Sequence, residues 1–141
     1  MATSATTRTP AQMWALVFGV VYLLVGIVGF AVTGFENFAD NTNDKLIIFE
    51  LNPFHNIVHL LLGVVWIGAA RAHNTAKSIN LLFGIVLGLV TILGFFGALE
   101  WLSIDGAGDP DNFLHLVTAA GSLYFGTAGA EMTSEAHPST V

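Results

Sequence analysis

The chain alternates between long apolar stretches and short polar segments. Four stretches contain no Asp, Glu, Lys or Arg, and they lie at 13–35, 54–70, 78–99 and 112–130. About 20 apolar residues in a helix are enough to cross the hydrocarbon core of a bilayer. An open strand could not satisfy its backbone groups in lipid, so each stretch is predicted to be a helix. We therefore predict transmembrane helices at about 13–35, 53–71, 78–102 and 110–130.

The segments between these stretches predict how the helices are connected. Asn52-Pro53 and Asp109-Pro110 each resemble a helix cap followed by proline in the first turn. The sequence thus predicts an all-α integral membrane fold, an antiparallel bundle of four transmembrane helices made of two tandem helical hairpins. This single domain would occupy 13–130, between a disordered polar tail at 1–12 and a polar C-terminal tail at 131–141.

The few basic residues predict the orientation of the bundle. Arg8 precedes the first predicted helix, and Arg71 and Lys77 flank the short turn between the second and third. Lys45 stands alone in the opposite loops, which are otherwise acidic. Because cytoplasmic loops are enriched in Lys and Arg, we expect a multi-pass protein of the cell membrane with both termini in the cytoplasm.

The two halves of the chain resemble each other. The segment 56–60, Asn-Ile-Val-His-Leu, matches 112–116, Asn-Phe-Leu-His-Leu. Upstream, the Gly-Phe pair at 29–30 matches the pair at 94–95, and Glu36 and Glu100 follow at nearly equal distances. Each copy contains two spans, so both copies cross the membrane in the same direction. This parallel internal repeat predicts a pseudo-two-fold axis along the membrane normal.

The repeat predicts a polar cluster inside the membrane, formed by Asn56, His59, Asn112 and His115. Residues three or four apart share one face of a helix, so each Asn should lie beside its His, and His55 should lie beside His59. One interpretation is structural: neutral histidines hydrogen-bond to the asparagines across helices. In either interpretation, Asn56 and Asn112 are expected to fix the imidazole tautomers.

The other interpretation is a ligand site. Imidazole binds transition metals and haem, and intramembrane ionisable residues usually face the protein interior. The candidate ligands for a haem or a transition metal are His55, His59, His115, Glu36 and Glu100. Separately, the small-residue motifs Gly84-x-x-x-Gly88 and Ser122-x-x-x-Gly126 are expected to allow close helix packing.

The doubled Asn-x-x-His-Leu motif, with four predicted helices and acidic outer loops, resembles the bacterial membrane protein family catalogued as domain of unknown function 4383. The resemblance covers about residues 10–130. It implies a membrane location and four helices, and it implies no established activity.

Composition narrows the function further. The 141 residues include no Cys, which excludes disulfides and thiol chemistry, and the net charge of −6 argues against a nucleic-acid partner. No sequence motif of an enzyme is present. We expect a non-enzymatic accessory or structural subunit that contacts the lipid bilayer and packs in a larger membrane complex or homo-oligomer. The alternative is a metal- or haem-binding redox or proton-relay protein that uses His59 and His115, and a minimal transporter is a third class.

Overall fold

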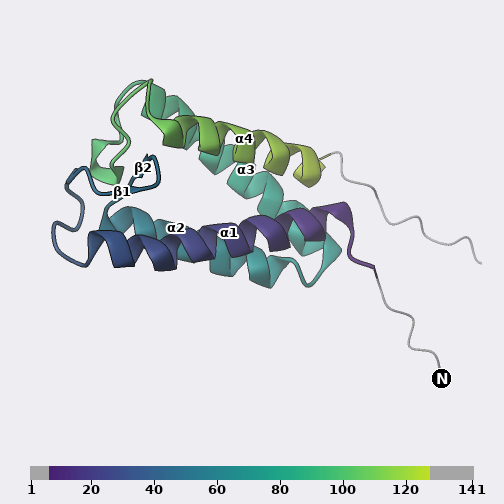
Figure 1. The fold of residues 1–141 in the computed structure, drawn as a ribbon. Helices are drawn as coiled ribbons and strands as arrows, with labels where there is room; N and C mark the ends of the chain where they lie inside the picture. Colours follow the sequence, from purple (N-terminus) through teal and green to yellow (C-terminus); the bar gives the residue numbers. More distant parts are fainter. Residues whose placement is uncertain (1–6, 128–141) are drawn as a thin grey trace, which may run out of the picture.

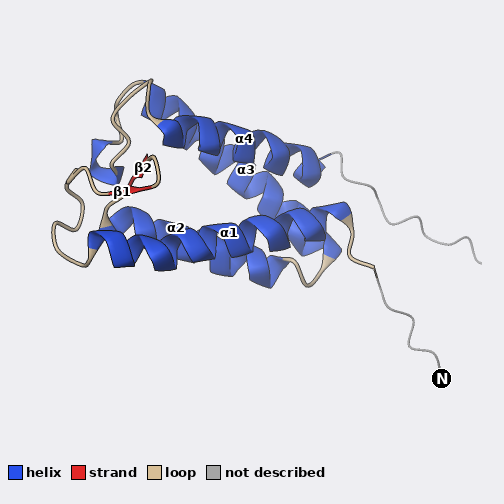
Figure 2. Ribbon diagram, viewed as in Figure 1, coloured by secondary structure: helices blue, strands red, loops and turns tan. Residues whose placement is uncertain are grey.

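The computed structural model describes residues 7–127, which form four helices in two antiparallel pairs (Figure 1). The first pair is α1 (Pro10–Thr33) with α2 (Pro53–Ala69), and the second is α3 (His73–Phe95) with α4 (Pro110–Thr127). Figure 2 shows that the two long connections, after α1 and after α3, lie together at one end of the molecule. We call this the loop end, and the opposite end, where α2 turns into α3, the turn end.

The helix ends differ from the predicted bounds where local capping decides them. Thr9 forms a capping box with Gln12, so α1 begins at Pro10, and the prediction of disorder up to residue 12 is wrong from Pro10 onward. Helix α3 begins at His73 rather than 78, and it ends at Phe95, before Gly97 with its φ of 69°. A separate 3₁₀ turn, η1 (Glu100–Leu102), follows. Residues 128–141, which include the predicted C-terminal tail, lie outside the described residues.

A two-stranded hairpin, which the sequence analysis did not predict, folds over the loop end. Strand β1 (Lys45–Leu46) pairs with β2 (Phe49–Glu50) in antiparallel register, with Lys45 opposite Glu50. Strand β2 contacts α4. The β-hairpin therefore places the connection between α1 and α2 in contact with the second helix pair.

The internal repeat is visible in how the helices touch. In the first pair Gly19 packs against Ile67, and in the second Gly84 packs against Leu123. These residues are equivalent in the repeat. Adding 65 to a residue number on α1 gives its equivalent on α3, and adding 56 to a residue number on α2 gives its equivalent on α4. The prediction for Gly84 is thus confirmed, whereas that for Gly88 is wrong, because no atom lies within 4 Å of a Cβ built there.

A second equivalent contact lies nearer the loop end. A Cβ built on Gly29 would clash with Oδ1 of Asn56, and one built on Gly94 would clash with Oδ1 of Asn112. Only glycine allows the asparagine side chain to approach the neighbouring helix this closely. Both hairpins therefore close through the same Gly–Asn contact.

Helix α1 buries small residues and exposes large apolar ones. The buried residues of α1 are Ala11, Ala15, Gly19, Tyr22, Gly26 and Gly29, whereas Leu24 and Ile27 are each 54% exposed. Helices α1 and α3 are each long and apolar enough to cross a membrane, and α2 is a shorter apolar helix. On α1, large apolar side chains thus face outward, and mainly small residues face inward.

The apolar core lies toward the turn end. Trp66, Phe83 and Leu87 fill it, and the indole N–H of Trp66 donates to Oδ1 of Asn80 over 3.0 Å. The amide of Asn80 donates in turn to the carbonyl of Ala11 over 3.1 Å, so one buried side chain links α3 to both helices of the first pair. Toward the loop end, buried polar side chains share the interior with a smaller apolar cluster of Leu99, Leu102 and Ile104.

Candidate functional site: a buried histidine cluster

Three histidines from two helices meet in the polar part of the interior. His55 and His59 lie one turn apart on α2, and His115 lies on α4. Their ring centroids are separated by 4.3 Å between His55 and His59, 6.1 Å between His55 and His115, and 6.3 Å between His59 and His115. One nitrogen from each ring lies within 4.8 Å of the others, and all three side chains are buried.

Several polar atoms in this region are buried and have no hydrogen-bond partner among the described residues. They include Nδ1 of His55 and of His115, and both ring nitrogens of His59. A buried polar atom without a partner costs about 1–3 kcal/mol. Native interiors contain few such atoms, and each one needs a physical reason. Their concentration here distinguishes this region from the rest of the interior.

Two further buried residues with polar side chains belong to this region. The ring of Tyr22 on α1 packs edge-on against His59, with centroids 5.0 Å apart, and its hydroxyl has no partner. Asp111, on the first turn of α4, is 1% exposed, and neither of its carboxylate oxygens has a partner. Sequence reasoning missed both residues. Extending the repeat alignment four residues upstream from His59 and His115 would have paired Asp111 with His55.

The asparagines of the motif do not act as predicted. The amide of Asn56 donates to Oγ1 of Thr33 over 2.9 Å, and that of Asn112 donates to the carbonyl of Gly106 over 2.6 Å. The first bond thus holds the end of α1 against α2, and the second holds the connection that precedes α4. Neither asparagine is hydrogen-bonded to a histidine, so the prediction that they fix the imidazole tautomers is wrong.

The structure does not bring the predicted glutamates to the histidines. Glu36 follows the end of α1 and Glu100 begins η1, and both are exposed. Neither joins the group of three histidines whose nitrogens converge. Each connection turns away from the bundle after its helix, so similar spacing along the chain does not produce a common depth in the structure.

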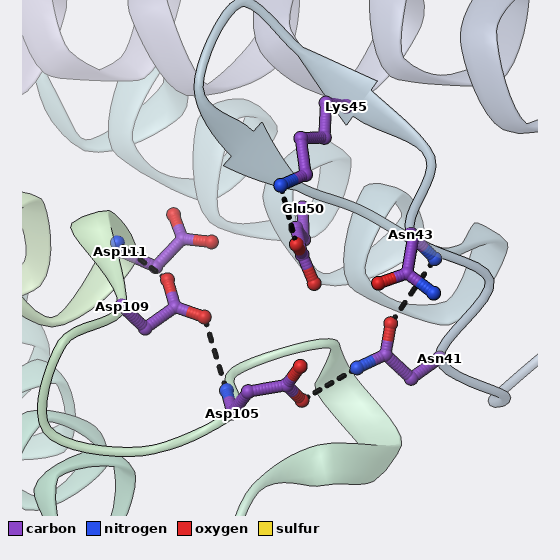
Figure 3. A network of polar contacts seen from close by, with 7 residues as sticks. All are labelled: Asn41, Asn43, Lys45, Glu50, Asp105, Asp109 and Asp111. Atoms are coloured by element: carbon purple, nitrogen blue, oxygen red, sulfur yellow. Dashed lines mark hydrogen bonds and ion pairs between the residues drawn. The ribbon is translucent and has the colours of Figure 1, made fainter.

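An acidic cavity lies beside the cluster, at the loop end. It has a volume of about 380 Å³, and its lining includes Lys45, Glu50, Asp105 and Asp109. Lys45 Nζ pairs with Oε1 of Glu50 at 2.8 Å, and this contact raises the pKa of Lys45 above its ordinary value. Asp109 accepts from the backbone N–H groups of Asp105 and Asp111, over 3.0 Å and 2.9 Å. Figure 3 shows the carboxylates of this network gathered around one space.

A larger cavity lies at the turn end, away from the histidines. Its volume is about 660 Å³, and its lining includes Gln12, Arg71 and His73. His73 is hydrogen-bonded to Oγ1 of Thr9 over 2.8 Å, so its ring has a partner. His73 lines this cavity and is not part of the histidine cluster, so its substitution serves as a control.

The fold and the site define a class: four-helix proteins with outward-facing apolar side chains and a buried cluster of three histidines. The sequence model of one family, described as Domain of unknown function (DUF4383), matches residues 12–128. The chain therefore belongs to that family, as its resemblance suggested. No curated protein and no solved structure matches the chain.

Proposed function

We propose that this protein crosses the membrane four times and binds one first-row transition-metal ion through His55, His59 and His115. The observation that carries the proposal is the convergence of three imidazole nitrogens within 4.8 Å in a buried site. Family membership neither adds to this proposal nor opposes it, because the function of the family is unknown.

The distribution of polarity supports the membrane part of the proposal. In lipid, helices associate through small residues, and all but one of the buried residues of α1 are Ala or Gly. Helices α2 and α4, with 17 and 18 residues, extend about 25–27 Å at the usual rise per residue. The core of a bilayer is about 30 Å thick, so these two helices nearly span it, and a few residues beyond their ends would complete the crossing. The basic residues Arg8, Arg71 and Lys77 support a cytoplasmic location for the turn end.

The donor set supports the metal part. Neutral imidazole suits Zn²⁺, Cu, Fe and Ni ions. Zn–N bonds of about 2.0–2.1 Å place the nitrogens of a tetrahedral site roughly 3.4 Å apart. Small rotations of side chains whose nitrogens already lie within 4.8 Å reach that spacing. An ion would also satisfy ring nitrogens that have no other partner.

The same geometry favours a bare ion over haem. A porphyrin needs a flat space between two axial ligands. Here the third imidazole lies within 4.8 Å of the other two, and the Tyr22 ring packs against His59. The porphyrin ring would compete with these side chains for the same space.

The role of accessory or structural subunit stays a prediction that depends on contacts with other proteins.

Metal analysis of the full chain in mild detergent tests the proposal. After incubation with Zn²⁺ or Co²⁺ and desalting, we expect about one ion per protein. Substituting His59→Gln or His115→Gln should abolish retention of the ion while the helical circular dichroism stays unchanged. The control is His73→Gln, which removes a histidine with a hydrogen-bonded ring at the turn end and should leave the stoichiometry unaltered. Retention of the ion by both cluster variants, or a haem Soret band in the native protein, would contradict the proposal.

A further inference from the structure

One carboxylate lines the acidic cavity, and a second follows the cavity lining on the first turn of α4. Glu50 lines the cavity, and its side chain is only 13% exposed. One of its oxygens pairs with Lys45, and the other is buried without a partner. Asp111 is buried deeper, and both of its oxygens are unpaired. A buried carboxylate without a partner is costly, which makes this pair an unusual feature for the interior of a bundle.

The two carboxylates connect the cavity to the cluster. Asp111 follows the cavity residues Asp109 and Pro110 directly, and it lies one helical turn before His115, on the same face of α4. The backbone N–H of Asp111 donates to Asp109, and strand β2, which carries Glu50, contacts α4. On the other side, His55 lies in the first turn of α2, five residues after Glu50 along the chain. Figure 3 shows Asp111 beside Asp109, with its carboxylate toward Glu50.

We propose that Glu50 and Asp111 form the route by which a divalent cation passes from the loop-end cavity to the three histidines. The inference rests on the proposed function and adds the direction from which the ion arrives. Among the described residues, Lys45 is the one base that lines the cavity. Its ammonium stays paired with Glu50 until the arriving cation displaces the ammonium.

The carboxylates and the imidazoles have different physical roles along this route. A cation that leaves water loses its hydration shell stepwise, and carboxylate oxygens replace water ligands at each step. Negative charge in a cavity with low-dielectric walls also raises the local concentration of cations. The ion then exchanges oxygen ligands for imidazole nitrogens, which bind transition metals more tightly than Mg²⁺ or Ca²⁺. The route thus attracts divalent cations generally, and the cluster selects among them.

Binding kinetics in detergent test the route. Stopped-flow mixing of the full chain with Co²⁺ follows the absorption of the ion as imidazole ligands replace water. We expect Glu50→Gln and Asp111→Asn each to slow association at least 10-fold, while one ion per protein still binds at saturation. Lys45→Met should accelerate association, because it frees Glu50. The control Glu36→Gln removes the same charge from an exposed position at the loop end and should leave the rate within about twofold.

The outcomes separate the two proposals. If the native protein binds no ion, the proposed function fails. If it binds the ion, and Glu50→Gln and Asp111→Asn associate as fast as Glu36→Gln, the histidine site stands and the route is wrong. Loss of the bound ion in Asp111→Asn at saturation would make Asp111 a ligand and would also overturn the route. Misfolding cannot imitate the accelerated association expected for Lys45→Met, so that variant keeps the test decisive.

Discussion

The two helical hairpins, α1 with α2 and α3 with α4, share their packing contacts and differ at the histidine cluster. Gly19 and Gly84 fit against equivalent residues of the partner helices, and Gly29 and Gly94 each accommodate an asparagine. The histidine at the centre is also repeated, as His59 and His115. One turn before it, however, the first hairpin has His55 and the second has Asp111. Duplication thus accounts for the scaffold, and the departure from symmetry places a third imidazole and a carboxylate beside the repeated pair.

The connections differ as well. The first carries the β-hairpin with the Lys45–Glu50 ion pair, and the second carries η1 and the acidic turn that ends at Asp109. These unequal segments meet at the loop end, where Asn52 Nδ2 of the first donates to the carbonyl of Trp101 in the second over 2.8 Å. The acidic cavity exists because the two connections are not copies of each other.

The largest effect is expected when the first hairpin is made to copy the second. The substitution His55→Asp replaces an imidazole by a side chain that is shorter and charged, so only two nitrogens remain. Changes to residues that merely support metal ligands weaken binding 10–100-fold, so we expect the loss of a ligand to weaken Co²⁺ binding by at least about 100-fold. Competition with a chromophoric chelator measures this. An affinity equal to that of His73→Asp would show that His55 is not a ligand.

Equivalent glycines should respond equally. Gly29→Ala and Gly94→Ala each place a methyl group against an asparagine oxygen, and overpacking of this kind costs about 1–3 kcal/mol. Thermal unfolding in detergent should show similar losses for both variants. Gly88→Ala is the matched control, because open space surrounds that position, and its melting temperature should not fall.

Combining each glycine change with removal of its asparagine tests the cause. If the clash is responsible, the pairs Gly29→Ala with Asn56→Ala and Gly94→Ala with Asn112→Ala should show favourable coupling, because the methyl group then has room. If, in both helix pairs, the stability loss of the double variant equals the sum of the two single losses, the shared Gly–Asn contact would be refuted.

A smaller effect is expected at Asn80, a buried side chain whose hydrogen bonds link the two helix pairs near the turn end. Asn80 occupies the position that Ala15 occupies in the first hairpin, at the offset of 65. Asn80→Ala leaves the Trp66 indole and the Ala11 carbonyl unpaired, which should cost about 1–2 kcal/mol of unfolding free energy. Substituting Asn74→Ala, an exposed position at the start of the same helix, provides the reference. Equal melting temperatures for the two variants would remove Asn80 from this role.

The helices were predictable because their signals are local. Uncharged stretches mark all four, and Asn52 accepts from the N–H of His55 as a predicted cap should. The β-hairpin was not predictable, since each strand has two residues and Ile47 adopts a φ of 64° without being glycine. The start of α3 was missed because Ala72 precedes it with no side-chain cap.

The site was predictable only in part. Spacing along α2 placed His55 beside His59, and the repeat placed His115 opposite, whereas the positions of Glu36 and Glu100 depend on how each connection turns. Tyr22 carries no signal in the sequence, because an aromatic residue in an apolar helix is usually part of the core. The partner of Asn112, Gly106, lies on a connection whose course the sequence does not specify.

X-ray absorption spectroscopy of the ion-loaded protein tests the central claim most directly, because it reports the ligands of the metal itself. For the full chain loaded with one equivalent of Zn²⁺, we predict three imidazole ligands with Zn–N distances of about 2.0–2.1 Å and the multiple-scattering signature of imidazole rings. The His59→Gln protein, treated identically, should lack this signal. A spectrum of the native protein with oxygen ligands alone would contradict the assignment of His55, His59 and His115 as a metal site.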